Sequence, residues 1–485
     1  MVRKWTQCLN PRVSCRAGPN NQTDTTPRSH RFQSATTNVT DESQIEATTD
    51  RLIRSASALL ISNVTGALLG VVFWVVAAHR YSAVNVGNGA AEIAAMNFLA
   101  TIAQFSPGLI FNRFLFASGA RAAHILRVGY SVSVGAALTV ASVFLFVSGR
   151  HSYIEPGPWS SIAFVFAVAL WVVFTIEDTA LIGLRATFVV PIENTSFSLA
   201  KLALLPLLAV SSPRSGVFQS WIFPIVVAVI PVNYYLFRRV IPRHVAQSQG
   251  RSLFPTRRVL SRMLAGEYFG SLALMGLMSL PSLLIVHELG GAAAAYFQTP
   301  WLVGTSFDFL LWTIATALTS EAAARPSSAP GAVRKAVRFT MVVVTPTIIV
   351  LVIGAPYFLK ILGHSYSHNG ARLLQLLILT VPFMAVNILY VTFARLARRV
   401  RRVIIIQVGL AVVTLTLMSI LMRHHGLNGV GVAFLIGQAT VAVIVFPSVY
   451  KQYRRPNMGP GFSPDSSLVI NVGSKSIAKD GGETP

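Results

Sequence analysis

Charged residues are scarce in this sequence, and acidic residues are the scarcest of them. Charged residues make up 12% of the 485 positions, against about 25% in a typical soluble domain. There are 17 acidic and 40 basic residues, which gives a formal net charge of +23. Hydrophobic residues make up 53% of the chain, and the mean hydropathy is +0.59. This composition excludes an ordinary soluble protein.

Cysteines and catalytic motifs are also nearly absent. Cys8 and Cys15 lie in a polar N-terminal segment, far from any histidine cluster, which argues against a metal site. No Gly-rich phosphate loop and no Ser/His/Asp arrangement is readable in the sequence. We therefore expect no metal, no cofactor and no catalytic residue, so that the protein is not an enzyme. The N-terminal segment also lacks the apolar core of a secretory signal peptide.

What the chain does contain is long apolar blocks. Examples are SALLISNVTGALLGVVFWVVAA at 57–78 and VIIIQVGLAVVTLTLMSILM at 403–422. Each block has roughly the 20 residues that a helix needs to cross a bilayer. We predict an all-α polytopic membrane protein with about twelve transmembrane helices, near residues 55–78, 89–117, 127–148, 159–183, 189–210, 216–237, 264–288, 292–320, 336–361, 371–394, 403–422 and 427–450.

The distribution of arginine predicts the orientation of these helices. Arginines crowd the even-numbered loops, above all 238–262 and 395–402, whereas the odd-numbered loops hold few. By the positive-inside rule both termini are cytoplasmic, in a multi-pass protein of the cell membrane. The basic excess also predicts contact with anionic membrane lipids, and we expect no nucleic acid partner. The predicted parts are disordered cytoplasmic tails at 1–51 and 451–485, six-helix halves at 52–237 and 264–450, and a basic cytoplasmic loop at 238–263.

The two halves share a weak internal sequence repeat. The second span of the first half opens with GNGAAEIAAMNFLATIAQF at 87–105, and that of the second half opens with GGAAAAYFQTPWLVGTSFDF at 290–309. Both begin with glycines and small residues after a short external loop. Repeated halves of this kind are typical of alternating-access transporters with a substrate path between the halves.

Three segments of the sequence form a recognisable pattern: SNVTGALLGVVFWVVAAHRYSAVNVG at 62–87, LIFNRFLF at 109–116 and IEDTALIGLRATFVVPIENTSFSLAKLALLPLLA at 176–209. They resemble bacterial polysaccharide-biosynthesis membrane proteins of the actinobacterial type, and the resemblance runs over about residues 52–450. These proteins are flippases for lipid-linked oligosaccharides in the multidrug/oligosaccharidyl-lipid/polysaccharide exporter superfamily. It implies transport without covalent chemistry. The family pattern matches this sequence at Arg113, Asp178, Asn194 and Lys201, and departs from it at His79 and Glu177.

Ionisable residues within the spans are costly and usually face a cavity or a partner. The rise of a helix, about 1.5 Å per residue, puts five of them in one layer near the cytosol: Arg113, Glu177, Asp178, Glu193 and Glu267. This layer is either a gate, with Arg113 bridging carboxylates, or a set of structural ion pairs. Glu193 and Glu267 are close enough to the interface to snorkel. Because adjacent helical residues point about 100° apart, Glu177 and Asp178 should face different partners.

Lys201 and Asp308 lie near the middle of the bilayer, in opposite halves of the chain. They mark either a substrate site, where Lys201 neutralises a pyrophosphate, or a permanent structural pair. Trp74, Trp159, Trp221 and Trp301 are expected in the interfacial aromatic belts.

Together with these buried charges, the resemblance implies a flippase that moves a polyprenyl-linked oligosaccharide or polysaccharide precursor across the cytoplasmic membrane. Its residues for substrate binding or gating would be Arg113, Glu177, Asp178, Asn194, Lys201 and Asp308. Its implied partners are the lipid-linked glycan and the glycosyltransferases or polymerase of the same pathway. Alternatives are a cation-coupled drug exporter using Asp178 or Asp308, and a non-catalytic component of a glycan synthesis complex. A membrane glycosyltransferase is disfavoured because the external loops are short and poor in acids, Glu155 being the main one.

Overall fold

A computed structural model describes residues 65–104, 110–111, 114–148, 154, 157–247, 257–324, 329–397 and 399–454. Across these ranges the regular secondary structure is helical, without strands. All of them belong to one compact unit, Ala58–Pro485. The predicted all-α fold class is therefore confirmed.

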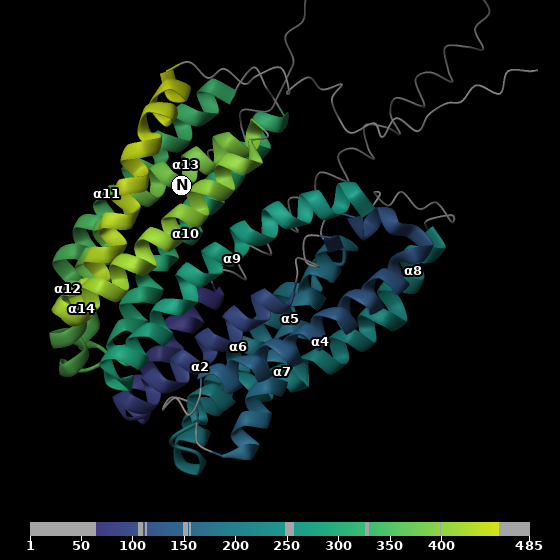
Figure 1. Ribbon diagram of the computed structural model, residues 1–485, viewed down its shortest axis with the longest axis horizontal. Helices are drawn as coiled ribbons and strands as arrows, with labels where there is room; N and C mark the ends of the chain where they lie inside the picture. The colour runs from purple at the N-terminus through teal and green to yellow at the C-terminus, as the bar shows by residue number, and fades with distance from the viewer. Residues whose placement is uncertain are drawn as a thin grey trace, which may run out of the picture. The chain divides into compact units, whose positions relative to one another are not determined.

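The first half of the described chain begins with a helix at Thr65–Arg80. It continues with α2 (Ala83–Ala103), η2 (Phe116–Arg121), α4 (Ala122–Ser148), α5 (Pro158–Gly183), α6 (Val189–Ser211), α7 (Gly216–Tyr235), η3 (Leu236–Val240) and α8 (Ile241–Gln247). Helices α4, α5, α6 and α7 lie side by side (Figure 1). Glu177, Glu193 and Lys201 are buried among these helices.

The second half contains α9 (Arg257–Leu289), α10 (Gly291–Ala324), α11 (Ala329–Lys360), α12 (His364–Leu379), α13 (Val381–Leu396) and α14 (Val400–Arg454). Helix α14 is interrupted at Gly426, whose φ of 55° and ψ of −139° are not helical. The interruption falls between the last two predicted spans. Helices α10 to α14 pack against one another, in green to yellow in Figure 1.

Seven helical segments of the described chain are long and apolar enough to cross a membrane. Two shorter apolar helices, Thr65–Arg80 and Val344–Lys360, accompany them. The protein is thus a polytopic α-helical membrane protein. The count of twelve spans remains a prediction.

The segment predicted as a basic loop is partly helical. Helix α7 continues through η3 and α8 to Gln247, and α9 already begins at Arg257, so both neighbours extend into 238–263. Arginine favours the helical conformation, so a charged segment that follows an apolar span can remain helical. Similarly, α14 runs to Arg454, beyond the predicted start of the C-terminal tail at 451. Residues 1–51, 248–256 and 455–485 lie outside the described residues.

The two segments of the internal sequence repeat lie in α2 and α10, and these helices pack against each other. A Cβ atom on Gly87 would collide with the carbonyl oxygen of Gly291, and one on Gly291 would lie 2.8 Å from the carbonyl oxygen of Val84. Real Cβ atoms do not approach backbone this closely, so glycine at both positions allows the helices to meet. The glycines of the repeat therefore allow a direct contact between the two halves.

Candidate functional site

The turn between α5 and α6 brings acidic residues together from two helices. Arg185 adopts the left-handed conformation, with φ at 61°. Its amide donates to the carbonyl of Ile182 (3.1 Å), and the amide of Ala186 donates to the carbonyl of Leu181 (2.8 Å). This hydrogen-bond pattern ends a helix sharply. The first turns of α6 therefore lie beside the last turns of α5, which carry Glu177 and Asp178.

A cluster of carboxyl and amide side chains forms beside this turn. We name it the carboxyl–amide cluster; its members are Tyr130, Glu177, Asp178, Glu193, Asn194 and Asn233. Asn194 Nδ2 donates to Asp178 Oδ2 at 3.0 Å. Asn233 Nδ2 donates to Glu177 Oε2, and the hydroxyl of Tyr130 donates to Asn233 Oδ1 at 2.9 Å. As the helical rotation predicts, Glu177 and Asp178 face different partners.

Two carboxyl groups of the cluster face each other inside the protein. Glu177 is 0% exposed and Glu193 is 4% exposed, and their carboxyl groups are close enough to interact electrostatically. Neither oxygen of Glu193 receives a hydrogen bond from another described group. Two buried carboxylates in contact repel each other unless a proton or a cation lies between them. The expectation that Glu193 snorkels to the interface was wrong, because its side chain is buried.

Lys201 lies two turns further along the same buried face of α6. This face presents Glu193, Phe197, Lys201 and Leu205, each four residues after the last. The ammonium nitrogen of Lys201 lies 4.1 Å from the ring centre of Trp221 on α7 and 4.9 Å from that of Phe197.

The ring of Phe73, from the first helix, completes the enclosure at 5.5 Å. We call Phe73, Phe197 and Trp221 the Lys201 box. Behind the box, Trp171 packs on Trp221 with 5.7 Å between ring centres. Three helices of the first half thus surround one cation with aromatic faces.

The rings of the box, not an acid, stabilise this buried charge. Lys201 is 7% exposed, and within the described chain no carboxylate forms an ion pair with it. A lysine at the centre of the bilayer costs about 2.5–3.5 kcal/mol on insertion scales. A desolvated cation–π contact contributes about 2 kcal/mol, so the contacts in the box are of a size to offset that cost. Asp308 is half-buried on α10, and the permanent Lys201–Asp308 pair is not present.

The structure thus joins some of the predicted site residues and separates others. Glu177, Asp178 and Asn194 meet in the carboxyl–amide cluster, whereas Lys201 has its own enclosure and Asp308 belongs to α10 in the other half. Arg113 and the side chain of Glu267 lie outside the described residues. No group of three potential metal ligands occurs in the described chain.

Sequence reasoning missed Tyr130 and Asn233, which complete the cluster. An asparagine within the apolar run VVAVIPVNYYLF was an available signal for Asn233. The aromatic belt was also only partly right. Trp159 is 81% exposed, whereas Trp74 and Trp301 are buried and Trp221 lines the Lys201 box.

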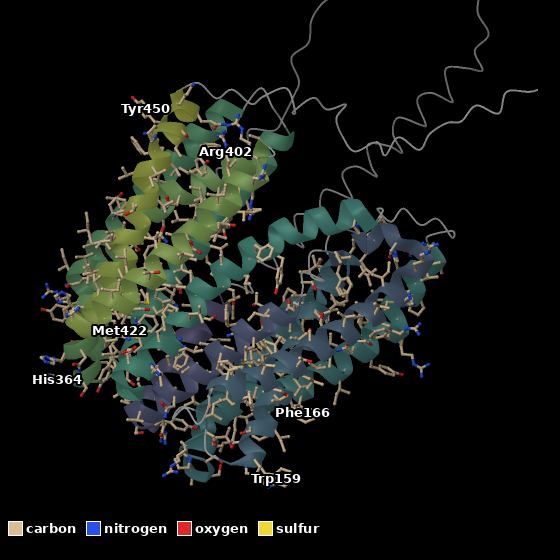
Figure 2. All side chains as sticks on the ribbon, in the orientation of Figure 1. Trp159, Phe166, His364, Arg402, Met422 and Tyr450 are labelled. Atoms are coloured by element: carbon tan, nitrogen blue, oxygen red, sulfur yellow. The ribbon has the colours of Figure 1, made fainter. Side chains whose placement is uncertain are left out.

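The labelled side chains of Figure 2 follow the predicted alternation of loops. Arg402 and Tyr450 lie at one end of the second-half helices, and His364 lies at the opposite end. Trp159 stands at the end of α5, with its side chain directed outward (Figure 2). This agrees with loops that alternate between two sides, although the side that faces the cytoplasm remains a prediction.

No family model and no curated protein matches this sequence. Solved structures do match its fold. An inward-facing multidrug resistance MATE family transporter of the MOP superfamily is 15% identical with a TM-score of 0.60, over 82% of this chain and 98% of that chain. An outward-facing MATE family transporter is 13% identical with a TM-score of 0.56, over 83% and 95%. The lipid II flippase MurJ, in an inward closed conformation, is 11% identical with a TM-score of 0.53, over 82% and 87%. At these identities the likeness establishes the fold alone.

Proposed function

We propose that this protein is a transporter of the MOP superfamily that moves a polyprenyl-linked oligosaccharide or polysaccharide precursor from the inner to the outer leaflet. Its fold is shared with MATE family transporters and with a lipid II flippase, which supports transport and a lipid-linked substrate. The family resemblance of residues 52–450 points to the same class. In this proposal the halves 52–237 and 264–450 move against each other around the substrate.

The observation that carries the proposal is the buried cation in the Lys201 box. Lys201 has aromatic neighbours and no carboxylate counter-ion among the described residues. An ammonium group without a counter-ion is suited to an anion such as the pyrophosphate of a polyprenyl-linked sugar. The ligand would supply the charge that the protein omits, while its polyprenyl tail stays among the lipids.

No bond of the substrate is made or broken in this proposal. Glycosyltransferases would supply the lipid-linked glycan on the cytoplasmic side, and a polymerase or further transferase would receive it outside. Anionic lipids would contact the basic surface at 238–263, which is rich in arginine.

The test is transport in proteoliposomes. The purified protein should move a fluorescent polyprenyl-pyrophosphate-linked oligosaccharide between leaflets without changing its mass. Empty liposomes and liposomes with heat-denatured protein are the controls. A lengthened or cleaved glycan would identify an enzyme instead, and no movement above the empty liposomes would refute the flippase.

A second candidate is a cation-coupled exporter of small molecules. It is supported by the facing carboxyl groups of Glu177 and Glu193, which need a proton or a cation between them. It is also supported by the fold shared with multidrug MATE family transporters. In the same proteoliposomes, this candidate predicts uptake of an organic dye driven by a proton or sodium gradient. The flippase proposal predicts no dye uptake.

A further inference from the structure

A cavity of about 170 Å³ lies in the first half, and its lining shares no residue with the Lys201 box. It is enclosed by α2, α5 and α7, and its lining includes Glu92, Phe164, Phe218, Gln219 and Phe223. Glu92 is 5% exposed and Phe164 is 1% exposed, whereas Phe223 is 50% exposed. The cavity therefore has a buried floor with a carboxyl group and an open rim with a phenyl ring.

The position of the cavity fits the external side of the predicted topology. Ile154 lines it from the segment between α4 and α5, Ser160 lines it from the first turn of α5, and Ser215 lines it from the segment between α6 and α7. Both segments are odd-numbered loops, which the arginine distribution predicts to be external. A group that has crossed the membrane would reach this cavity last.

The polar atoms of the cavity favour a ligand that donates hydrogen bonds. A carboxylate accepts hydrogen bonds and has about four sites for them. The amide of Gln219 donates through Nε2 to the hydroxyl of Ser215 at 2.9 Å, and this leaves its carbonyl oxygen as an acceptor. Glu92 and Gln219 thus suit a partner with several hydroxyl groups.

The remaining walls favour an apolar ring face. Phe164 and Phe218 pack with 5.9 Å between their ring centres, and Phe223 stands at the rim. The cavity is smaller than the roughly 300–1,000 Å³ of sites for drug-sized ligands. A single pyranose ring combines this size with hydroxyl donors at its edge and apolar C–H groups on its faces.

We propose that this cavity binds one sugar residue, the terminal pyranose of the transported glycan, on the external side. This proposal rests on the flippase function above and adds a second site to it, separate from the lysine that would bind phosphate. The shared chemistry is a pyranose ring, whether free in solution or attached to the lipid carrier. A site at this place would hold the sugar end after the head group has crossed.

The full chain in lipid nanodiscs, probed with free glucose, galactose and N-acetylglucosamine by saturation-transfer NMR, tests the proposal. At least one sugar should show transfer to its ring protons. Transfer should fall about tenfold with Glu92→Gln, as expected for the loss of a charge-assisted hydrogen bond. Ala163→Phe, which obstructs the lining and leaves every polar group in place, should have the same effect. Ala203→Phe, on an exposed position of α6 outside the cavity, should leave transfer unchanged.

A second arm uses the polyprenyl-pyrophosphate-linked oligosaccharide with a photoactivatable terminal sugar. Cross-links should map to α5 and α7 around Phe164 and Phe218. The proposal is overturned if no sugar binds, if binding is indifferent to both cavity variants, or if ethanolamine binds there and sugars do not. Transport by the wild-type protein without sugar binding would refute the cavity and leave the flippase standing. Sugar binding without transport would do the reverse.

Discussion

At the scale of single residues, the first half stabilises its buried charges in two different ways. The carboxyl groups of Glu177 and Asp178 receive hydrogen bonds from Asn233 and Asn194. Lys201 is instead enclosed by aromatic rings. In the first arrangement an amide donates to one oxygen of each acid, and the second leaves the ammonium group able to bind an anion.

Asn233→Leu should destabilise the protein by about 1–3 kcal/mol. The change removes the donor to buried Glu177 and the acceptor for Tyr130, and each buried group left without a partner is costly. The matched control is Asn369→Leu, whose amide bonds the carbonyl of Ser365 at an exposed position of α12. Thermal unfolding in detergent should show a lower midpoint for Asn233→Leu and little change for the control. Equal midpoints would mean that Asn233 does not stabilise the cluster.

Part of the candidate site could be predicted at this scale, and part could not. The sequence shows that Glu177, Asp178 and Lys201 are charged residues within apolar spans. It also predicts that the adjacent side chains of Glu177 and Asp178 point in different directions. That Trp221 encloses a lysine is not visible, because its partner is brought there by the packing of α6 on α7. Asn233 was missed for the same reason.

At the scale of elements, the contact between α2 and α10 depends on glycine. A Cβ atom on Gly87 would collide with the backbone of Gly291, whereas one on Gly70 would meet nothing within 4 Å. The closeness of these helices is therefore encoded at particular positions and not by the general abundance of small residues.

Gly87→Ala should separate α2 from α10 and lower stability, while Gly70→Ala should be neutral or stabilise by up to about 1 kcal/mol. The second effect follows because alanine is favoured over glycine inside a helix. A thiol reagent should also label a cysteine at Val84 faster in Gly87→Ala than in Gly70→Ala. If both glycine variants behave alike, the close contact is not maintained in the membrane.

Helices were predictable from apolar blocks, but their ends were less so. The last two spans are separated at Gly426, where the sequence predicts the change from one to the next. The helical extension of α7 into 238–247 was not predicted, because charge was taken as the mark of a loop. Polarity shows where a span leaves the bilayer, whereas the end of a helix depends on capping and backbone geometry.

At the scale of the whole molecule, the distribution of arginine predicts which loops face the cytoplasm and which face outward. The fold by itself does not establish this orientation. With Cys8 and Cys15 replaced by serine, single cysteines at 155 and 250 should label from opposite sides of the membrane, 155 from outside. A membrane-impermeant maleimide on intact cells provides the measurement. Labelling of both from the same side would contradict the predicted spans between them.

The class of polytopic α-helical membrane protein could be predicted from the sequence, because the apolar composition and the length of the apolar blocks indicate transmembrane helices. The fold shared with MATE family transporters and MurJ agrees with the predicted all-helical, multi-span membrane architecture. The substrate was harder to predict from the sequence, because it depends on which side chains line the same binding site. Lys201 and Asp308 share a depth in the sequence, yet they do not form an ion pair.

The most direct test of this account is glycolipid transport by Lys201→Met in proteoliposomes. Methionine keeps the length of the side chain and packs well against aromatic rings, so the variant should fold. With polyprenyl-pyrophosphate-linked oligosaccharide as substrate, we expect transport to fall about tenfold or more, which corresponds to about 1.4 kcal/mol. Lys360→Met, at an exposed position at the end of α11, should transport like the wild type. Wild-type transport by a well-folded Lys201→Met protein would contradict the assignment of Lys201 to the substrate phosphate.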